Sequence, residues 1–274
     1  MSSYAPPTTL SPSRIDSFLS CPLAFRFSSL DGLFDPPTEA TVRGTMVHRA
    51  LEHFYADTAA QLDAERMNDS VDQMLTEFKH DDDVIFLKLE GERFTRLGDE
   101  CRKLAMNALR MEDPSMVNPI GLELRIEAEF DGFILRGIID RLERDNDDRL
   151  VITDYKTGRA PSPSFEKKAL AGVHFYALLC QREFDEDATE LRLMYVKSSQ
   201  TITTRPSSKT ISFTEQRLTA VHRAISQACA SGEFATRKSA LCKFCTFSSW
   251  CPEFGGDPQL ALVEAPRRNT TSPE

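Results

Sequence analysis

The sequence predicts an α/β protein, a mixed sheet flanked by helices. Residues 134–142 and 150–155 are two apolar runs joined by a polar connection, a pattern typical of a strand, a turn and a second strand. Residues 122–130 alternate between apolar and charged side chains, as in a strand with one buried face. Apolar residues recur at helical spacing over 47–55 and 97–109, so helices accompany these strands. With 41% hydrophobic residues among 274, the chain can bury a substantial core.

The N-terminal segment predicts a short helix after a disordered start. Residues 1–10 contain two prolines and several hydroxyl side chains, and we expect them to be disordered. Ser11 can cap a helix whose first position is Pro12. This helix should end near Cys21, because the following Pro22 disfavours helical geometry in the residue before it.

Residues 44–118 predict a helical insert. Gly44 opens a long amphipathic helix that carries His48 in its first turns, and residues 70–110 indicate two further helices. A histidine beside an apolar stripe is more often packed or on the surface than a ligand. The acidic run 81–83 favours a solvated helix start, since negative charge suits that end of the helix dipole.

The strand pair at 134–155 carries the strongest chemical signal. Each strand holds one carboxylate among apolar residues, Asp140 and Asp154, and Lys156 lies on the same face as Asp154. A buried carboxylate is unfavourable unless it is paired or binds a cation. Two of them beside a lysine indicate a divalent metal site suited to hydrolysis.

The C-terminal half predicts further elements of both kinds. We expect a helix over residues 165–181 and a strand over 191–196. An edge hairpin is predicted from residues 201–204 and 210–213. Ser212 and Glu215 would then form a capping box for a helix that reaches residue 231.

Seven cysteines include a close group near the C-terminus, Cys242, Cys245 and Cys251. The chain shows no signal peptide and no apolar run that could span a membrane, which indicates a cytoplasmic protein. In a reducing compartment these thiols favour metal ligation or burial over disulfides. Three thiolates need one more to complete a four-sulfur site, and on spacing alone zinc is a serious alternative to iron.

The net charge of −9 argues against a simple nucleic-acid-binding protein, which needs Lys and Arg for phosphate contacts. The charge is unevenly distributed, however. Residues 57–100 hold 13 acidic and 5 basic residues, net −8, whereas residues 198–250 hold 7 basic and 2 acidic residues, net +5. A basic face could follow a phosphate backbone, although both segments could equally be ordinary solvated surfaces.

Residues 137–141, Gly-Ile-Ile-Asp-Arg, and 154–158, Asp-Tyr-Lys-Thr-Gly, resemble the two halves of the active-site motif of RecB-family PD-(D/E)XK nucleases. Gly44-Thr45 followed by His48 is similar to a further motif of that family. The resemblance implies a restriction-endonuclease-like core in which Mg²⁺ or Mn²⁺ is held by Asp140, Asp154, His48 and the backbone carbonyl of Tyr155. It also implies that Lys156 orients the attacking water or helps to deprotonate it.

The same family carries an acidic metal ligand on the preceding strand. Glu123 and Glu127 both face the right way, and we favour Glu123 slightly. The family also has a Gln-x-x-x-Tyr pair on the following helix. Here Tyr176 stands at the tyrosine position, but Gly172 replaces the glutamine, so substrate contacts at this point rest on Tyr176.

Cys21 within its own segment and the three C-terminal cysteines resemble the iron–sulfur branch of these nucleases. The resemblance implies a 4Fe–4S cluster held by Cys21, Cys242, Cys245 and Cys251, with zinc as the alternative. We therefore expect one nuclease domain over residues 11–254, with an iron–sulfur segment at 237–252 and a disordered tail at 255–274.

The function implied by the resemblance is metal-dependent hydrolysis of DNA, as an exonuclease on single-stranded ends in recombination or repair. Two alternatives stay open: trimming of CRISPR spacer precursors, and a non-catalytic iron–sulfur DNA-binding module. No Walker A motif is present, so a helicase, or an integrase, would be a separately encoded partner.

Overall fold

The computed structural model describes residues 4–57 and 61–266. The chain divides into two compact units, which interleave along the sequence. Unit 1 comprises Met1–Pro36, Glu129–Arg136 and Glu215–Glu274, and unit 2 comprises Pro37–Ala128 and Gly137–Thr214. The single nuclease domain that the sequence predicts over residues 11–254 stays a prediction.

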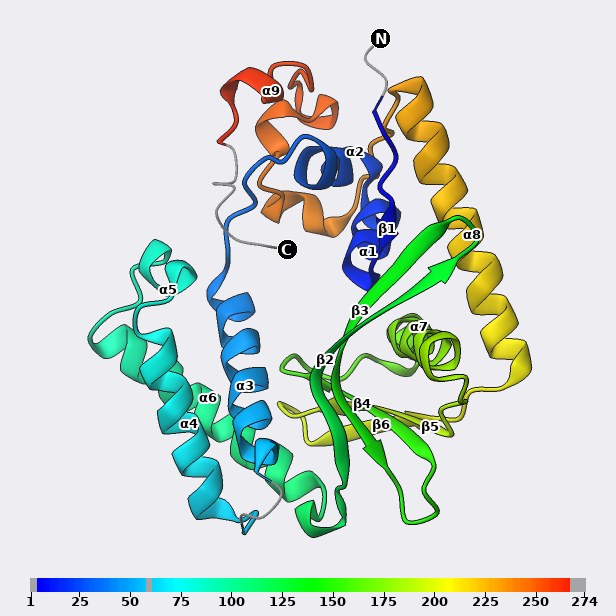
Figure 1. Ribbon diagram of the computed structural model, residues 1–274. Helices are drawn as coiled ribbons and strands as arrows, with labels where there is room; N and C mark the ends of the chain where they lie inside the picture. Colours follow the sequence, from blue (N-terminus) through cyan, green and yellow to red (C-terminus); the bar gives the residue numbers. More distant parts are fainter. Residues whose placement is uncertain (1–3, 58–60, 267–274) are drawn as a thin grey trace. The chain divides into compact units, whose positions relative to one another are not determined.

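Unit 2 contains helices where the sequence predicts a helical insert. They are α3 (Glu39–Ala56), α4 (Ala64–Phe78), α5 (Asp82–Phe86) and α6 (Glu92–Met111), followed by a 3-10 turn at Pro114–Met116. Figure 1 shows α3, α4 and α6 packed side by side. Helix α3 begins five residues before Gly44, because Thr38 caps it: the Thr38 hydroxyl accepts the Thr41 N–H at 3.1 Å, and the Thr41 hydroxyl accepts the Thr38 N–H at 2.8 Å.

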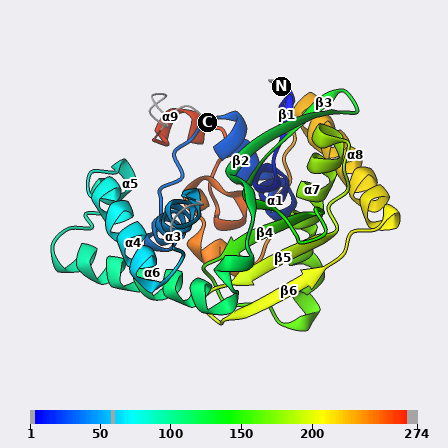
Figure 2. The ribbon, with the colours of Figure 1, turned by 60° about the horizontal axis from the view of Figure 1, so that its bottom comes forward.

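The sheet is mixed, as predicted. The strands are β1 (Thr9–Leu10), β2 (Pro119–Phe130), β3 (Phe133–Arg144), β4 (Leu150–Lys156), β5 (Glu190–Tyr195) and β6 (Gln200–Thr204). Their order is β1-β3-β4-β5-β6, and β2 pairs with β3. Strands β3 and β4 are antiparallel, β4 and β5 parallel, and β5 and β6 antiparallel. Figure 2 shows β4, β5 and β6 as neighbours.

Helices cover both faces of the sheet in unit 2. The apolar core of α3, α4 and α6 includes Tyr155, Met194 and Val196 from the strands. After a 3-10 turn at Pro163–Phe165, α7 (Glu166–Phe184) packs on β4 and β5. Strand β4 is therefore buried on both sides, and polar side chains on it need partners.

The predicted edge strand at residues 210–213 is wrong, as is the capping box of Ser212 and Glu215. Both stretches lie inside α8 (Ser208–Ser231). The helix begins earlier because Ser207 and Thr210 cap it reciprocally: the Thr210 N–H donates to the Ser207 hydroxyl at 3.2 Å, and the Ser207 N–H donates to the Thr210 hydroxyl at 2.7 Å.

The predicted disorder of residues 1–10 and 255–274 is wrong for the described parts of unit 1, and residues 1–3 lie outside the described residues. Within the predicted disordered residues 1–10, β1 pairs in parallel with β3 and the Leu10 side chain is fully buried. The predicted first helix is confirmed as α1 (Pro12–Ser20), with Ser11 accepting the Arg14 N–H. It is followed by α2 (Pro22–Phe25) and a π-helical turn at Arg26–Leu30.

The C-terminal part of unit 1 consists of short turns. They are 3-10 helices at Ala240–Phe244, Ser248–Trp250 and Pro252–Phe254, and α9 (Ala261–Glu264). Helix α9 falls in the predicted disordered tail and is held because Ala261 and Ala265 pack with Phe27 and Phe247. Residues 267–274 of that tail lie outside the described residues. No helix in the described part of the chain is long and apolar enough to cross a membrane.

Candidate active site

Strand pairing brings Asp140 and Asp154 together in unit 2. The antiparallel ladder of β3 and β4 runs from Arg144 opposite Leu150 to Arg141 opposite Thr153. Continued by one residue, this register sets Asp140 opposite Asp154. Directly opposed residues of antiparallel strands lie close enough for their side chains to interact, so the two carboxylates share one location.

The main chain of Tyr155 links two of the predicted ligands. Its N–H donates to Asp140 Oδ2 at 2.6 Å, and its carbonyl oxygen accepts a hydrogen bond from His48 Nε2 at 3.1 Å. The Asp140 carboxylate thus accepts the hydrogen bond of a β4 backbone N–H just beyond the last paired residues of the two strands. The backbone of Tyr155, whose carbonyl is a predicted ligand, accordingly contacts both His48 and Asp140.

His48, Glu123 and Asp140 form a compact group of metal-ligating side chains. Nδ1 of His48 lies 3.4 Å from Glu123 Oε1 and 3.5 Å from Asp140 Oδ1. One ligand atom from each of the three lies within 4.8 Å of the other two. His48, on α3, meets Asp140 of β3 across 92 residues of sequence.

Glu123 reaches this group because the backbone of β2 is irregular there. Its φ is 43°, in the left-handed region that non-glycine residues seldom adopt. From Arg125 to Phe130 exposed and buried residues alternate, whereas residues 121–124 are all half-buried. Irregular strand backbone next to a site re-aims a side chain. Glu127, the other predicted acid, lies in the regular part of the strand and is exposed.

Lys156 pairs with the buried Asp154. Its Nζ forms an ion pair with Asp154 Oδ2, and Asp154 is only 5% exposed. Burial lowers the pKa of the Lys156 ammonium, but the Asp154 carboxylate outweighs this effect and the net pKa is raised. Lys156 is therefore a cation at neutral pH.

Crowded carboxylates shift the other titratable groups. Burial and the neighbouring Asp140 raise the pKa of Asp154 to about 6, and Lys156 and His48 only partly oppose them. Burial disfavours charge on His48, yet hydrogen bonds to Asp140 and Glu123 outweigh it and raise the pKa of the imidazole to about 10. Without a metal, the site thus keeps a proton on His48 to balance its carboxylates.

Tyr176 on α7 lies beside the acidic group. Burial first, and then the carboxylates of Asp154, Asp140 and Glu123, raise the pKa of its phenol. Its ring packs against Gly137, where an added Cβ would stand 2.8 Å from Tyr176 Cε1. At Gly172 nothing lies within 4 Å of an added Cβ, so the position where the family has glutamine is open.

These residues fit a hard divalent cation. Carboxylate oxygens, a carbonyl and an imidazole are ligands that Mg²⁺ and Mn²⁺ accept in proteins. Three carboxylates, from Glu123, Asp140 and Asp154, repel one another in a partly buried place, and a cation relieves that repulsion.

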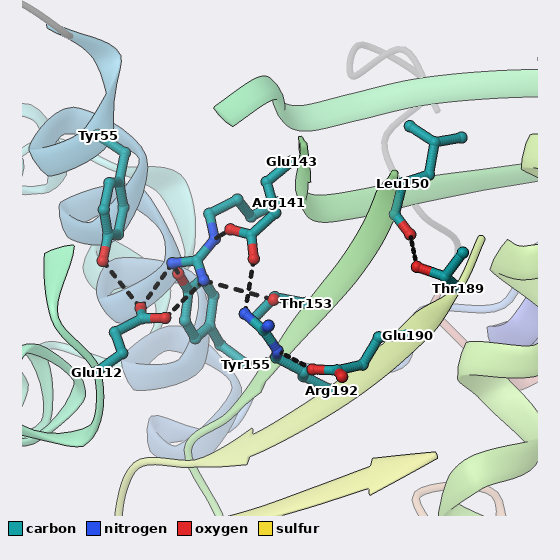
Figure 3. Close-up of polar contacts among 10 residues, drawn as sticks. All are labelled: Tyr55, Glu112, Arg141, Glu143, Leu150, Thr153, Tyr155, Thr189, Glu190 and Arg192. Carbon is teal, nitrogen blue, oxygen red and sulfur yellow. Dashed lines mark hydrogen bonds and ion pairs between the residues drawn. The ribbon is translucent and has the colours of Figure 1, made fainter. Parts of the chain in front are cut away.

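Behind the site lies a buried polar network that sequence reasoning missed (Figure 3). At its centre is Arg141, fully buried, whose guanidinium makes two hydrogen bonds to Glu112, at 2.6 and 2.7 Å, and an ion pair with Glu143 at 2.6 Å. The Tyr55 hydroxyl also donates to Glu112, at 2.8 Å. The sequence marks Arg141 only as the last residue of the motif at 137–141 and does not indicate its partners.

The four predicted cluster cysteines all belong to unit 1. None of the described cysteines is in a disulfide. Cys21, Cys245 and Cys251 pack against one small hydrophobic cluster. Burial raises the pKa of the Cys245 thiol, and Cys21, Cys251 and Cys242 raise it further. Their sulfurs do not form a compact group like that of His48 among the residues that the structure describes.

The family model for the PD-(D/E)XK nuclease superfamily matches residues 9–252. Among solved structures, an exonuclease candidate from Eubacterium rectale aligns with a TM-score of 0.54 at 10% identity, over 86% of this chain and 88% of that one. The protein SSO0001 aligns with a TM-score of 0.37 at 14% identity, over 78% and 97%. No curated protein matches this chain.

Proposed function

Since this chain belongs to the PD-(D/E)XK nuclease superfamily, we propose that it is a metal-dependent deoxyribonuclease of RecB type that degrades single-stranded DNA from its ends. Membership of the superfamily implies hydrolysis of phosphodiester bonds in a nucleic acid. The observation that carries the proposal is the convergence of Asp140, Asp154 and Lys156 with His48 and Glu123.

The acidic group supplies the metal ligands in this proposal. Glu123, Asp140, Asp154, His48 and the Tyr155 carbonyl would hold one Mg²⁺ or Mn²⁺. When bound there, a divalent ion would polarise the scissile phosphate and make the attacking water more acidic. His48 must give up its extra proton to become a ligand, because a coordinating imidazole is neutral.

Lys156 acts on the phosphate as a fixed positive charge. Its raised pKa keeps the ammonium protonated, so it orients the attacking water and stabilises the negative charge that develops on the phosphate oxygens. This role replaces the alternative in which Lys156 accepts a proton. Tyr176 likewise keeps its phenolic proton and can donate a hydrogen bond toward the phosphate.

We infer DNA ends as the substrate by analogy with the RecB family, which the motifs at residues 137–141 and 154–158 resemble. The basic segment 198–250 supplies positive charge for a phosphate backbone. End processing in repair and trimming of spacer precursors would use this same chemistry. The choice between them depends on partners, such as a helicase or an integrase.

Labelled single-stranded DNA tests the proposal. Substrates labelled at the 5′ or the 3′ end are incubated with Mn²⁺, Mg²⁺ or EDTA and with wild type, Lys156→Ala, or Lys103→Ala as a matched exposed lysine on α6. We expect metal-dependent loss of label with wild type and Lys103→Ala, and none with Lys156→Ala. A wild-type protein that binds DNA but leaves it intact with every metal would support the non-catalytic module instead.

For unit 1, we propose a 4Fe–4S cluster on Cys21, Cys242, Cys245 and Cys251. Support comes from their spacing, from reduced thiols and from their mutual influence on the Cys245 pKa. In such a cluster each cysteine binds a different iron, so the sulfurs stand farther apart than around one zinc ion. Anaerobically purified protein should be brown and contain iron and sulfide. Colourless protein that contains one zinc per chain would refute the cluster.

A further inference from the structure

We propose that Arg141 is a positioning residue for the metal site, which it controls from the opposite side of the sheet through Tyr155. This inference rests on the proposed metal-dependent nuclease and adds a residue that is not itself a ligand. Arg141 follows Asp140 on β3, and Tyr155 follows Asp154 on β4. Because side chains alternate along strands, Arg141 and Tyr155 point away from the carboxylates.

Arg141 is held on all sides within unit 2. Its guanidinium contacts Glu112 and Glu143, and it also donates to the Tyr155 hydroxyl at 2.5 Å. The guanidinium lies 4.8 Å from the centre of the Tyr55 ring. A planar guanidinium with five donors can satisfy such a set in one orientation only, so the network fixes the positions of its partners.

Tyr155 carries this constraint through the strand. Its phenol accepts from Arg141, its main-chain N–H donates to Asp140, and its carbonyl accepts from His48, whose ring lies edge-on to the Tyr155 ring at 6.2 Å between centroids. Movement of the phenol would therefore move the backbone atoms that set the two ligands. Since metal ligands need placement to within fractions of an ångström, a partner bound behind them affects affinity.

The network also joins the elements that bear the ligands. Tyr55 lies on α3 two turns after His48, and its hydroxyl donates to Glu112 just after α6. Arg192 on β5 binds Glu143 at 2.7 Å. Helix α3 and strands β3 and β4 thus each supply both a proposed ligand and a member of the network (Figure 3).

Stability alone does not account for this arrangement. Buried ion pairs lose hydration, and apolar replacements of similar volume are often equally stable. A device that sets geometry, in contrast, needs directional contacts. This difference separates the two roles experimentally, because a positioning residue changes metal affinity in variants that remain folded.

Two conservative variants test the inference, Arg141→Lys and Tyr155→Phe. Lysine keeps the charge but loses the fork of donors, and phenylalanine removes only the hydroxyl that accepts from Arg141. The matched control is Arg144→Lys on the same strand, since Arg144 also forms a two-bond pair, with the half-buried Glu186 at 2.6 and 2.7 Å. Mn²⁺ binding is measured by electron paramagnetic resonance, folding by urea denaturation, and cleavage by kcat and KM.

We expect both variants to bind Mn²⁺ about 10-fold or more weakly, as is typical when partners of metal ligands are removed, while KM for DNA at saturating Mn²⁺ stays unchanged. Arg144→Lys should bind Mn²⁺ like wild type. Folded variants with wild-type Mn²⁺ affinity would overturn the inference and leave Arg141 a structural residue. Wild type that binds Mn²⁺ without cleaving DNA would instead overturn the proposed function alone, because the binding titration does not depend on cleavage.

Discussion

Replacement of Asp154 by asparagine should stabilise the metal-free protein at neutral pH and abolish nuclease activity. Burial, reinforced by Asp140, raises the pKa of the Asp154 carboxyl to about 6. The charged form is therefore disfavoured in the folded protein, even with Lys156 beside it. Asparagine resembles the protonated acid and carries no charge.

The magnitude follows from the pKa shift. From 3.8 to about 6 is about two units, and each unit corresponds to about 1.4 kcal/mol, so ionised Asp154 destabilises the fold by about 3 kcal/mol. Because the folded pKa lies above the unfolded one, the folded state binds more protons between these values. The free energy of unfolding therefore falls as pH rises from about 4 to about 6, and it stays lower above that window. The gain in Asp154→Asn at neutral pH is at most this amount.

Urea denaturation in EDTA measures this effect at pH of about 4 and about 7.5, on either side of the window. The control is Asp145→Asn in the β3–β4 turn, where hydrogen bonds from Arg149 lower the pKa of the Asp145 carboxyl. That variant should be less stable than wild type at the higher pH, the opposite sign. Mn²⁺ should then stabilise wild type but not Asp154→Asn. An Asp154→Asn protein that is less stable in EDTA would refute the reasoning and make Asp154 a structural partner of Lys156.

Three further predictions concern His48 and two glycines. His48 must release a proton to bind metal, so the affinity for Mn²⁺ should rise by up to about tenfold per pH unit below pH about 10. In His48→Asn this dependence on pH should be weaker. An affinity for Mn²⁺ that does not change with pH in wild type would contradict this. Gly172→Ala and Gly172→Gln should each stabilise α7 by about 1 kcal/mol in thermal denaturation, and a changed cleavage rate in Gly172→Gln alone would assign that position to substrate contact. Gly137→Ala should lose about 1–3 kcal/mol by overpacking against Tyr176, while Gly158→Ala, with open space, should not.

The centre of the site could be predicted because its signal is local. Asp140, Asp154 and Lys156 lie within 17 residues on two adjacent strands, and strand periodicity fixes which side chains share a face. The choice between Glu123 and Glu127 was different. The alternating pattern along β2 places both glutamates on the same face of the strand. Only the left-handed backbone at Glu123 distinguishes them, and a non-glycine residue gives no sequence signal for that conformation.

Long-range pairing explains what the sequence did not reveal. Glu112 follows the end of α6 and looks like any exposed acid, yet it binds Arg141 across 29 residues. The sequence predicts a strand at the start of α8 because Thr210, Ile211 and Phe213 favour strands locally. The cap at Ser207 and Thr210 overrides that preference.

Charge balance on the two sides of the strand pair accounts for their different roles. Behind the strands, Arg141 and Arg192 match Glu112 and Glu143 one to one, and the half-exposed Glu190 adds charge only where water screens it. In front, Glu123, Asp140 and Asp154 face a single lysine once His48 is neutral, which leaves a net charge of −2. A divalent cation neutralises that charge, and the proton on His48 is a partial substitute for it. The side that is balanced by its own residues can set geometry, whereas the unbalanced side has the charge that suits a divalent metal.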